Sequence, residues 1–205
     1  MADLLPLPAS RDEIHHIQSE RKKIAFERAK TAGWYKGKLD HIPADKLEDP
    51  GVWGQIPIIT KDILRTFNHS EFMDNFNVAR ATDIAEYWRS GGTTGKPVFY
   101  PRTFEDVKYG LESWARTFPA INIGPGDLCH ISFPLGIHPA GQIWARSAHQ
   151  MNVGMNWVGA GNAVSSEAQV DLILALKPTV LISMSSFALH LINVADTKGI
   201  DLSES

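Results

Sequence analysis

The sequence predicts an α/β fold in which an N-terminal helical segment is followed by βαβ units, which form a mainly parallel sheet covered by helices. Short β-branched and aromatic runs alternate with segments of helical length from about residue 81 onward, a pattern typical of parallel strands joined by helical crossovers. Serine and threonine stand before several helical segments as N-caps. Of the 205 residues, 43% are hydrophobic and 21% are charged, which is ordinary globular usage. We expect residues 1–80 to form the helical segment and residues 81–205 the α/β subdomain.

The N-terminal part begins with a helix. Residues 10–38 are predicted to form a helix followed by a loop, because Ser10 and Glu13 have the spacing of a capping box. The basic side chains of this helix alternate with glutamates and lack the interleaved aromatic rings that stack on bases, so we interpret them as a solvated face. Further on, Thr60 is predicted to cap a short helix after an extended stretch.

Two strands and a helix open the α/β part. Residues 86–89 and 98–100 are aromatic and β-branched enough to be strands on either side of a glycine-rich loop. Thr103 is predicted to cap a helix that continues to about residue 118. The acidic Glu105 and Asp106 lie in its first turn, where the helix dipole favours negative charge.

From residue 124 onward, strands and helices alternate. A turn is predicted at residues 124–127, which contain two glycines and a proline. The predicted strands are residues 128–133, 153–158 and 179–183. The predicted helices are residues 139–150, residues 166–176 with Ser166 opening a capping box, and a last helix that runs from Ser185 or Ser186 to about residue 195. Because a helix separates each strand from the next, the strands are expected to be parallel.

Bulk composition excludes several classes of partner. The net charge of −3 gives no global argument for binding nucleic acid or an anionic membrane, and no apolar segment reaches the length of a membrane span. The one cysteine, Cys129, has no internal partner for a disulfide, and the N-terminus has no basic secretory leader. Both observations indicate a reducing, cytoplasmic setting. The eight histidines show no ligand spacing, so no metal site is predicted.

The most informative stretch is the glycine-rich loop between the first two strands. It consists of Ser90, Gly91, Gly92, Thr93, Thr94, Gly95 and Lys96, and Pro97 follows it. Glycine lets the backbone approach a ligand closely. Successive backbone N–H groups, hydroxyls and an ammonium group together make an anion site. A polyphosphate is the ligand that this combination favours.

Three other interpretations of the loop fit less well. A Walker A loop needs glycine where Ser90 stands, and a hydroxyl residue after the lysine, where Pro97 stands. A dinucleotide-binding loop needs a spacing that Gly91, Gly92 and Gly95 do not have. A plain glycine-rich hairpin explains the glycines but not the threonines and the lysine among them.

The loop resembles the Ser/Thr-Gly-rich signature of adenylate-forming enzymes, and further marks follow it in order. Residues 57–65 are similar to the Pro-x-x-Thr-Lys-x-x-Leu-Arg element of the phenylacetate–CoA ligase branch of the AMP-binding acyl-CoA synthetases. Other segments similar to that branch are residues 124–127, 159–162, 177–181 and 186–189. Together these marks cover nearly the whole chain, from about residue 10 to residue 200.

The resemblance implies an ATP-dependent ligase that joins a small carboxylic acid, aromatic acids included, to CoA through an acyl-adenylate. The implied cofactors and co-substrates are ATP, Mg2+ and CoA. The glycine loop would hold the ATP phosphates, with Thr93, Thr94 and Lys96 on the leaving pyrophosphate. The implied acid-binding residues are Phe133, Leu135, Gly136, His138 and Gly141. Leu135 and His138 stand where phenylacetate-type enzymes carry aromatic residues, which argues against phenylacetate itself, and His138 fits a histidine bonded to the backbone equally well.

The same resemblance implies that the chain is the N-terminal part of such an enzyme and is inactive alone. The adenine-binding segments and a C-terminal lid domain with an essential lysine would follow residue 205, so no catalytic residue is assigned, and Lys96 is not that lysine. The surface left uncovered favours self-association into a homo-oligomer. Two alternatives stay open: a non-catalytic nucleotide- or partner-binding module of the same fold, and an adenylating enzyme whose acceptor is not CoA.

Overall fold

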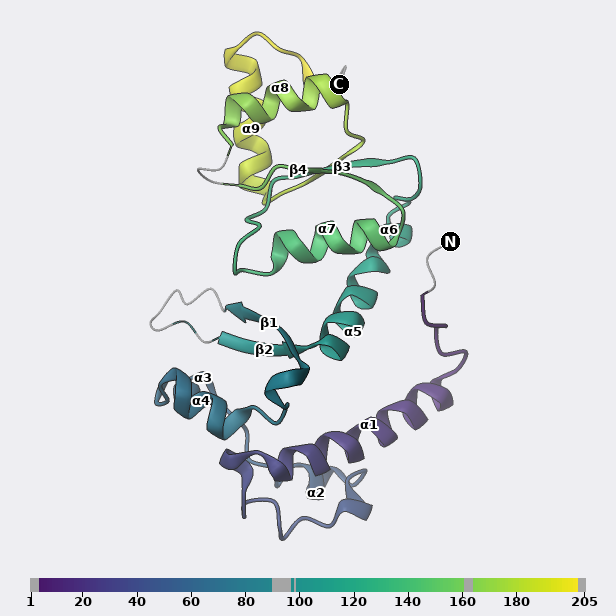
Figure 1. Cartoon of the computed structure of the whole chain (residues 1–205). Coiled ribbons are helices and arrows are strands. Elements are labelled where there is room, and N and C mark those ends of the chain that lie inside the picture. The colour runs from purple at the N-terminus through teal and green to yellow at the C-terminus, as the bar shows by residue number, and fades with distance from the viewer. Residues whose placement is uncertain (1–3, 90–96, 98, 161–163, 203–205) are drawn as a thin grey trace. The chain divides into compact units, whose positions relative to one another are not determined.

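A computed structural model describes residues 4–89, 97, 99–160 and 164–202. The chain divides into two compact units, one made of Pro6–Thr103 and the other of Met1–Leu5 together with Phe104–Ser205 (Figure 1). The domain division expected between residues 80 and 81 stays a prediction. No helix of the described chain is long and apolar enough to cross a membrane.

The first unit begins with α1 (Arg11–Thr31). The N–H of Glu13 donates to Ser10 Oγ (3.1 Å), and the Glu13 carboxylate accepts from the N–H of Ala9 (2.6 Å), so the predicted N-cap is confirmed. A small apolar core forms where the following loops fold back on this helix. Its buried members are Phe26, Leu39, Ile42 and Leu47.

Short helical elements follow α1 in the first unit. They are η1 (Gly33–Tyr35), η2 (Ala44–Lys46), α2 (Pro50–Trp53), α3 (Lys61–Arg65), α4 (His69–Phe76) and η3 (Ala81–Asp83). Thr60 accepts from the N–H of Ile63 at 3.4 Å, which confirms its predicted role as the N-cap of α3. Asn68 and Glu71 form a full capping box at the start of α4. These caps explain how such short helices begin at fixed residues.

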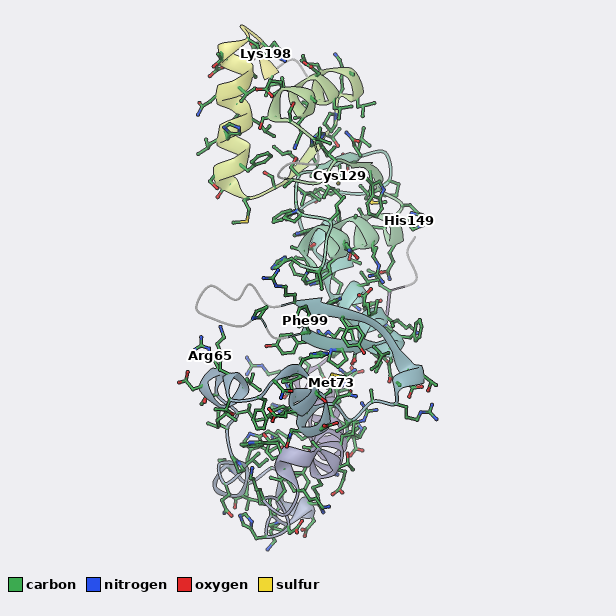
Figure 2. The ribbon with its side chains drawn as sticks, turned by 60° about the vertical axis from the view of Figure 1, so that its left-hand side comes forward. Arg65, Met73, Phe99, Cys129, His149 and Lys198 are labelled. Atoms are coloured by element: carbon green, nitrogen blue, oxygen red, sulfur yellow. The ribbon has the colours of Figure 1, made fainter. Side chains whose placement is uncertain are left out.

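The first unit ends in a β-hairpin. Strands β1 (Ile84–Arg89) and β2 (Phe99–Thr103) are antiparallel, and the last residue of β1, Arg89, lies opposite the first residue of β2, Phe99. Figure 2 labels Phe99. Alternate residues of β1 are exposed and half-buried, as expected for a strand with one solvated face. Both strands were predicted.

The second unit contains a parallel three-stranded sheet. Strand β3 (Leu128–Ile131) lies in the centre, between β4 (Gly154–Trp157) and β5 (Val180–Ile182). Both pairings are parallel. Helix α7 (Ala140–Gln150) connects β3 to β4, and α8 (Ser166–Leu176) connects β4 to β5. The α/β prediction, including the three parallel strands and their crossover helices, is confirmed.

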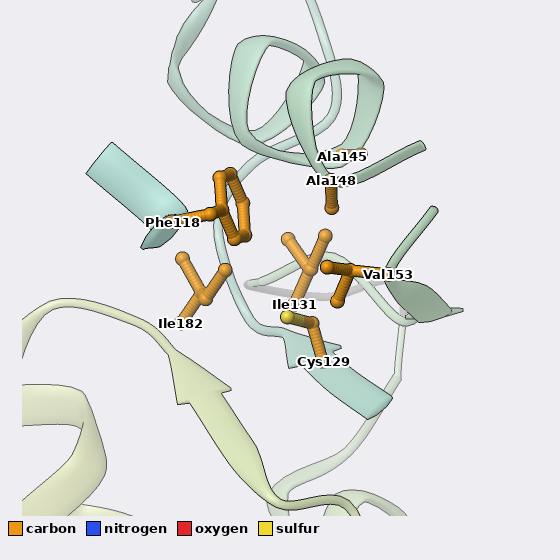
Figure 3. Close-up of a cluster of buried hydrophobic side chains, with 7 residues drawn as sticks. All are labelled: Phe118, Cys129, Ile131, Ala145, Ala148, Val153 and Ile182. Atoms are coloured by element: carbon orange, nitrogen blue, oxygen red, sulfur yellow. The ribbon is translucent and has the colours of Figure 1, made fainter. Parts of the chain in front are cut away.

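Helices cover both faces of this sheet. Helix α7 lies on one face, and α8 and α9 (Ser185–Thr197) lie on the other (Figure 1). Helices α5 (Phe104–Ala115) and α6 (Thr117–Ala120) precede the sheet, and α5 packs on α7. The core under α7 is apolar and is drawn in Figure 3. Its buried members are Phe118, Cys129, Ile131, Ala145, Ala148, Val153 and Ile182.

Two predicted helix caps in the second unit, Ser166 for α8 and Ser185 or Ser186 for α9, were wrong. Ser165, not Ser166, caps α8, because its Oγ accepts from the N–H of Ala168 at 3.2 Å. Ser166 is then free to meet His190 Nε2 of α9 at 2.9 Å. Helix α9 has Met184 at its N-cap and therefore begins without a side-chain cap.

Candidate functional site

The carboxyl ends of the three parallel strands form the candidate site. Ligands of open α/β sheets bind in the crevice outside these strand ends. Beyond the strands, the N–H of Ser132 donates to Ile182 O and the N–H of Gly159 donates to Ile131 O, each at 2.9 Å. These bonds tie together the chain segments that leave the ends of the sheet. The segment predicted to bind the acid starts directly after Ser132.

Gly141 lets the first turn of α7 approach that segment closely. A Cβ at this position would lie 2.5 Å from Pro134 O and 3.0 Å from both Phe133 O and Leu135 Cδ2. Glycine has no Cβ, so the backbones meet without a clash. The Leu135 side chain reaches the next strand exit too, because its Cδ1 lies 3.6 Å from where a Cβ of Gly159 would stand.

The loop before α7 is also held by a side chain. Gln142 Nε2 donates to Leu135 O at 2.8 Å and to Gly136 O at 3.0 Å. His138 is exposed, and its Nδ1 lies 3.5 Å from the N–H of Ala140, a distance at the limit of a hydrogen bond. The structure thus brings Phe133, Leu135 and Gly141 together and leaves His138 at the surface. Their role in binding an acid stays a prediction.

A buried polar cluster, which the sequence did not predict, lies below these loops. We call it the edge cluster. It consists of three buried residues, His130 of β3, Ser132 directly after β3 and Gln169 of α8, together with half-buried Asn156 of β4. Ser132 Oγ donates to Gln169 Oε1 at 2.7 Å, and His130 Nε2 lies 3.4 Å from the same oxygen. Asn156 Nδ2 lies 3.1 Å from His130 Nδ1.

Burial favours the neutral form of His130. Its ring is completely buried, and this burial lowers the pKa of His130, an effect that the hydrogen bond from His130 Nε2 to Gln169 Oε1 partly offsets. The contacts fit the tautomer with its proton on Nε2, because Nδ1 faces the amide donor of Asn156 and Nε2 faces an amide oxygen. A directed chain of hydrogen bonds therefore runs from β4 through β3 to α8.

The opposite end of β3 carries structural contacts rather than a binding site. Asp127 Oδ2 accepts from the N–H of Gly124 at 2.8 Å, and its Oδ1 accepts from Thr179 Oγ1 at 2.7 Å. These bonds lower the pKa of Asp127. They also tie the predicted turn at residues 124–127 to the start of β5. Beside it, burial and the Asp127 charge raise the pKa of Cys129 to about 11, so this thiol is inert.

The predicted phosphate-binding residues, Ser90, Gly91, Gly92, Thr93, Thr94, Gly95 and Lys96, lie outside the described residues. The described residues nearest to them on the two strands, Arg89 and Phe99, are paired. Within the described ranges, no three acidic, histidine or cysteine residues gather as a metal site would require.

Comparison with known proteins finds relatives along nearly the whole chain. No family model matches the sequence. Phenylacetate-coenzyme A ligase of Aromatoleum evansii is 28% identical over 203 residues, which are 97% of this chain and 44% of that enzyme. The ligases of the same name from Thermus thermophilus and Escherichia coli are 28% and 26% identical over 95% and 90% of this chain. The chain spans less than half the length of these relatives.

Solved structures agree on the fold. The structure of 2-hydroxyisobutyryl-CoA ligase in complex with 2-HIB-AMP and CoA, in its thioesterification state, matches with a TM-score of 0.83 and 19% identity over 98% of this chain and 45% of that one. The open conformation of the same ligase matches with a TM-score of 0.82 and covers 50% of that chain. The sequence and fold comparisons together confirm that this chain is similar to part of the phenylacetate–CoA ligases, the branch that the ordered motifs indicated.

Proposed function

We propose that this chain is part of an ATP-dependent carboxylic acid–CoA ligase. The observation that carries the proposal is the similarity to phenylacetate-coenzyme A ligases along 97% of the chain, which includes the glycine loop and the strand exits. We place the reaction in the cytoplasm, because thiols stay reduced there and the single cysteine of this chain needs no disulfide partner.

The proposed reaction has two steps. A carboxylate oxygen of the acid attacks the α-phosphorus of ATP, the bond to the β-phosphate oxygen breaks, and pyrophosphate leaves. The thiolate of CoA then attacks the carbonyl carbon of the acyl-adenylate, the bond to the AMP oxygen breaks, and a thioester forms. The first step brings two anions together, so it depends on fixed donors around the phosphates.

The glycine loop is our candidate for those donors. We assign Thr93, Thr94, Lys96 and the backbone N–H groups of residues 90–96 to the β- and γ-phosphates. Donors aimed at developing charge are commonly worth about 3–4 kcal/mol each. The strands before and after the loop, β1 and β2, are antiparallel. This supports the assignment over a Walker A loop, which leads from a strand into a helix.

The acid is proposed to bind at the strand exits. The candidates remain Phe133, Leu135, Gly136, His138 and Gly141, of which Leu135 lies between two strand exits and restricts the room there. The relatives' names support a small acid, since one names phenylacetate and the other 2-hydroxyisobutyrate. An aromatic acid is therefore included in the proposal.

Among the described residues, no cluster of carboxylates could hold the proposed magnesium ion, so we assign no described residue to it. We expect the chain alone to be inactive, because its relatives are more than twice as long. A non-catalytic module of the same fold, an acceptor other than CoA and a homo-oligomeric state are outcomes that the following experiment separates.

The test is acid-dependent exchange of labelled pyrophosphate into ATP by the natural protein that contains this chain, with a panel of small aliphatic and aromatic acids. Lys96→Ala should reduce the exchange at least about 100-fold, the loss that follows removal of one such donor, while the exposed Lys108→Ala serves as the matched control. AMP release that depends on CoA identifies the acceptor. If no acid supports exchange, the ligase proposal is wrong, and the non-catalytic binding module of the same fold becomes the favoured interpretation. Light scattering of the same sample gives the oligomeric state.

A further inference from the structure

The edge cluster is placed where an apolar core would be expected. On β3, Cys129 and Ile131 face the apolar core under α7, whereas His130 and Ser132 face α8, and all four are buried. Burying polar groups is costly unless each finds a partner. Here the partners are provided by Gln169, whose side chain is fully buried as well.

The oxygen and the nitrogen of the Gln169 amide form hydrogen bonds with two different segments. Its Oε1 accepts from Ser132 Oγ and faces His130 Nε2, both at β3. Its Nε2 donates to Gly159 O at 3.3 Å and approaches Val164 O at 3.5 Å, both in the connection that follows β4. One planar group thus joins the exit of β3 to the exit of β4.

These two exits are the ones that flank the candidate acid-binding segment. Ser132 directly precedes Phe133, and Gly159 lies against Leu135. A shift of either exit would change the space around Leu135. We propose that Gln169 is a positioning residue that sets the distance between these exits and thereby the affinity for the acid, a proposal that rests on the proposed ligase function.

The chemistry of the side chain explains why glutamine is needed. Glutamate at this position would still accept from Ser132 and His130, but its carboxylate would repel the carbonyl oxygens of Gly159 and Val164. Methionine has a similar length and would lose both sets of bonds. Gln169→Glu therefore removes the bonds to the segment after β4, and Gln169→Met removes both sets, so each variant breaks the link between the two exits.

The first test measures hydrogen exchange of the 205-residue chain and needs no ligand. The N–H of Gly159 is bonded to Ile131 O, and the N–H of Ile143 in α7 is bonded to Pro139 O at 2.8 Å. In Gln169→Glu and Gln169→Met, exchange at Gly159 should rise at least about 10-fold relative to Ile143, the change expected from losing one buried hydrogen bond. Unchanged relative exchange in both variants overturns the proposal.

The second test uses kinetics in the natural protein that contains this chain. Gln169 bonds the segments that flank the candidate acid-binding residues and none of the residues assigned to the phosphates. Both variants should therefore raise KM for the acid about 10-fold, as loss of a buried hydrogen bond predicts, with KM for ATP unchanged. The matched control is Ser147→Ala, which removes a buried hydroxyl that donates to Leu111 O at 3.3 Å on the other face of the sheet. A purely structural role predicts equal effects in the control and in the Gln169 variants.

The two tests fail in distinguishable ways. If wild-type protein shows no acid-dependent exchange of pyrophosphate, the ligase function is wrong, and hydrogen exchange at Gly159 still decides whether Gln169 fixes the exits. If wild-type protein is active but neither variant changes KM for the acid, Gln169 does not position the acid site. If one Gln169 variant does not fold, the effects on exchange and on KM are compared between the other Gln169 variant and Ser147→Ala.

Discussion

Substitution of Gly141 by alanine tests the close approach at the start of α7. In an ordinary exposed helical position, replacing glycine by alanine stabilises a protein by about 1 kcal/mol. At Gly141 the added Cβ would stand 2.5 Å from Pro134 O and 3.0 Å from Phe133 O, and both atoms belong to the backbone. The carbonyl groups cannot rotate away as a flexible side chain could, so the loop or the helix must shift.

The two effects have opposite signs, and their magnitudes decide the outcome. Overpacking of this kind costs about 1–3 kcal/mol, and contact with backbone on two sides favours the upper end. After subtraction of the gain in helix propensity of about 1 kcal/mol, Gly141→Ala should lower the free energy of unfolding by about 1–2 kcal/mol. In the natural protein it should also raise KM for the acid, because Leu135 would have to move.

Chemical denaturation followed by circular dichroism measures the free energy of unfolding directly. Gly136→Ala is the matched control, since a Cβ there meets nothing within 4 Å and the residue lies in the same segment. We expect the control to lie within about 0.5 kcal/mol of wild type, as surface substitutions do. A Gly141→Ala variant as stable as wild type would refute the close approach on which the site is built.

Three further predictions concern the sheet. Cys129, whose pKa is raised to about 11, should resist alkylation in the folded chain and react fully in denaturant, and rapid labelling of native protein would contradict its burial. Ile131→Ala should lower the free energy of unfolding by about 2–5 kcal/mol and the exposed Leu181→Ala by far less, and equal losses would refute the core assignment. The pKa of Asp127 is depressed in the folded state, so its stabilisation is present above the ordinary carboxyl pKa near 4 and lost as pH falls through the folded pKa. The stability difference between wild type and Asp127→Asn should therefore be full at neutral pH and shrink in acid, and a constant difference would show that the charge has no role.

Features that depend on near neighbours in the chain were predictable. Ser10 and Thr60 cap their helices through backbone N–H groups three residues on, so the sequence alone contains the whole interaction. The predicted cap of α8 was wrong because Gln169, which would complete a capping box with Ser166, bonds instead to distant segments, its Oε1 accepting from Ser132 Oγ. Ser165 caps the helix, and Ser166 meets His190 of α9.

The role of Gln169 could not be predicted for a related reason. Its partners Ser132 and His130 lie 37 and 39 residues away in the chain, and its own neighbours mark it only as a polar residue in the first turn of a helix. A weaker signal was present on β3, where polar His130 and Ser132 alternate with apolar Cys129 and Ile131. That alternation predicts a polar face, but the partner of the face emerges only from the packing of α8.

The two faces of β3 therefore have different tasks. The face toward α7 buries apolar side chains, and apolar packing tolerates small shifts because its attraction has no fixed direction. The face toward α8 is held by directional hydrogen bonds among the edge cluster, and a small shift would break them. A sheet whose strand exits must keep a fixed spacing gains more from the second kind of contact, and that contact is found directly below the exits of β3 and β4. On our proposal for Gln169, the apolar face of β3 contributes stability and the polar face fixes the spacing of the strand exits, which offsets the cost of burying polar groups there.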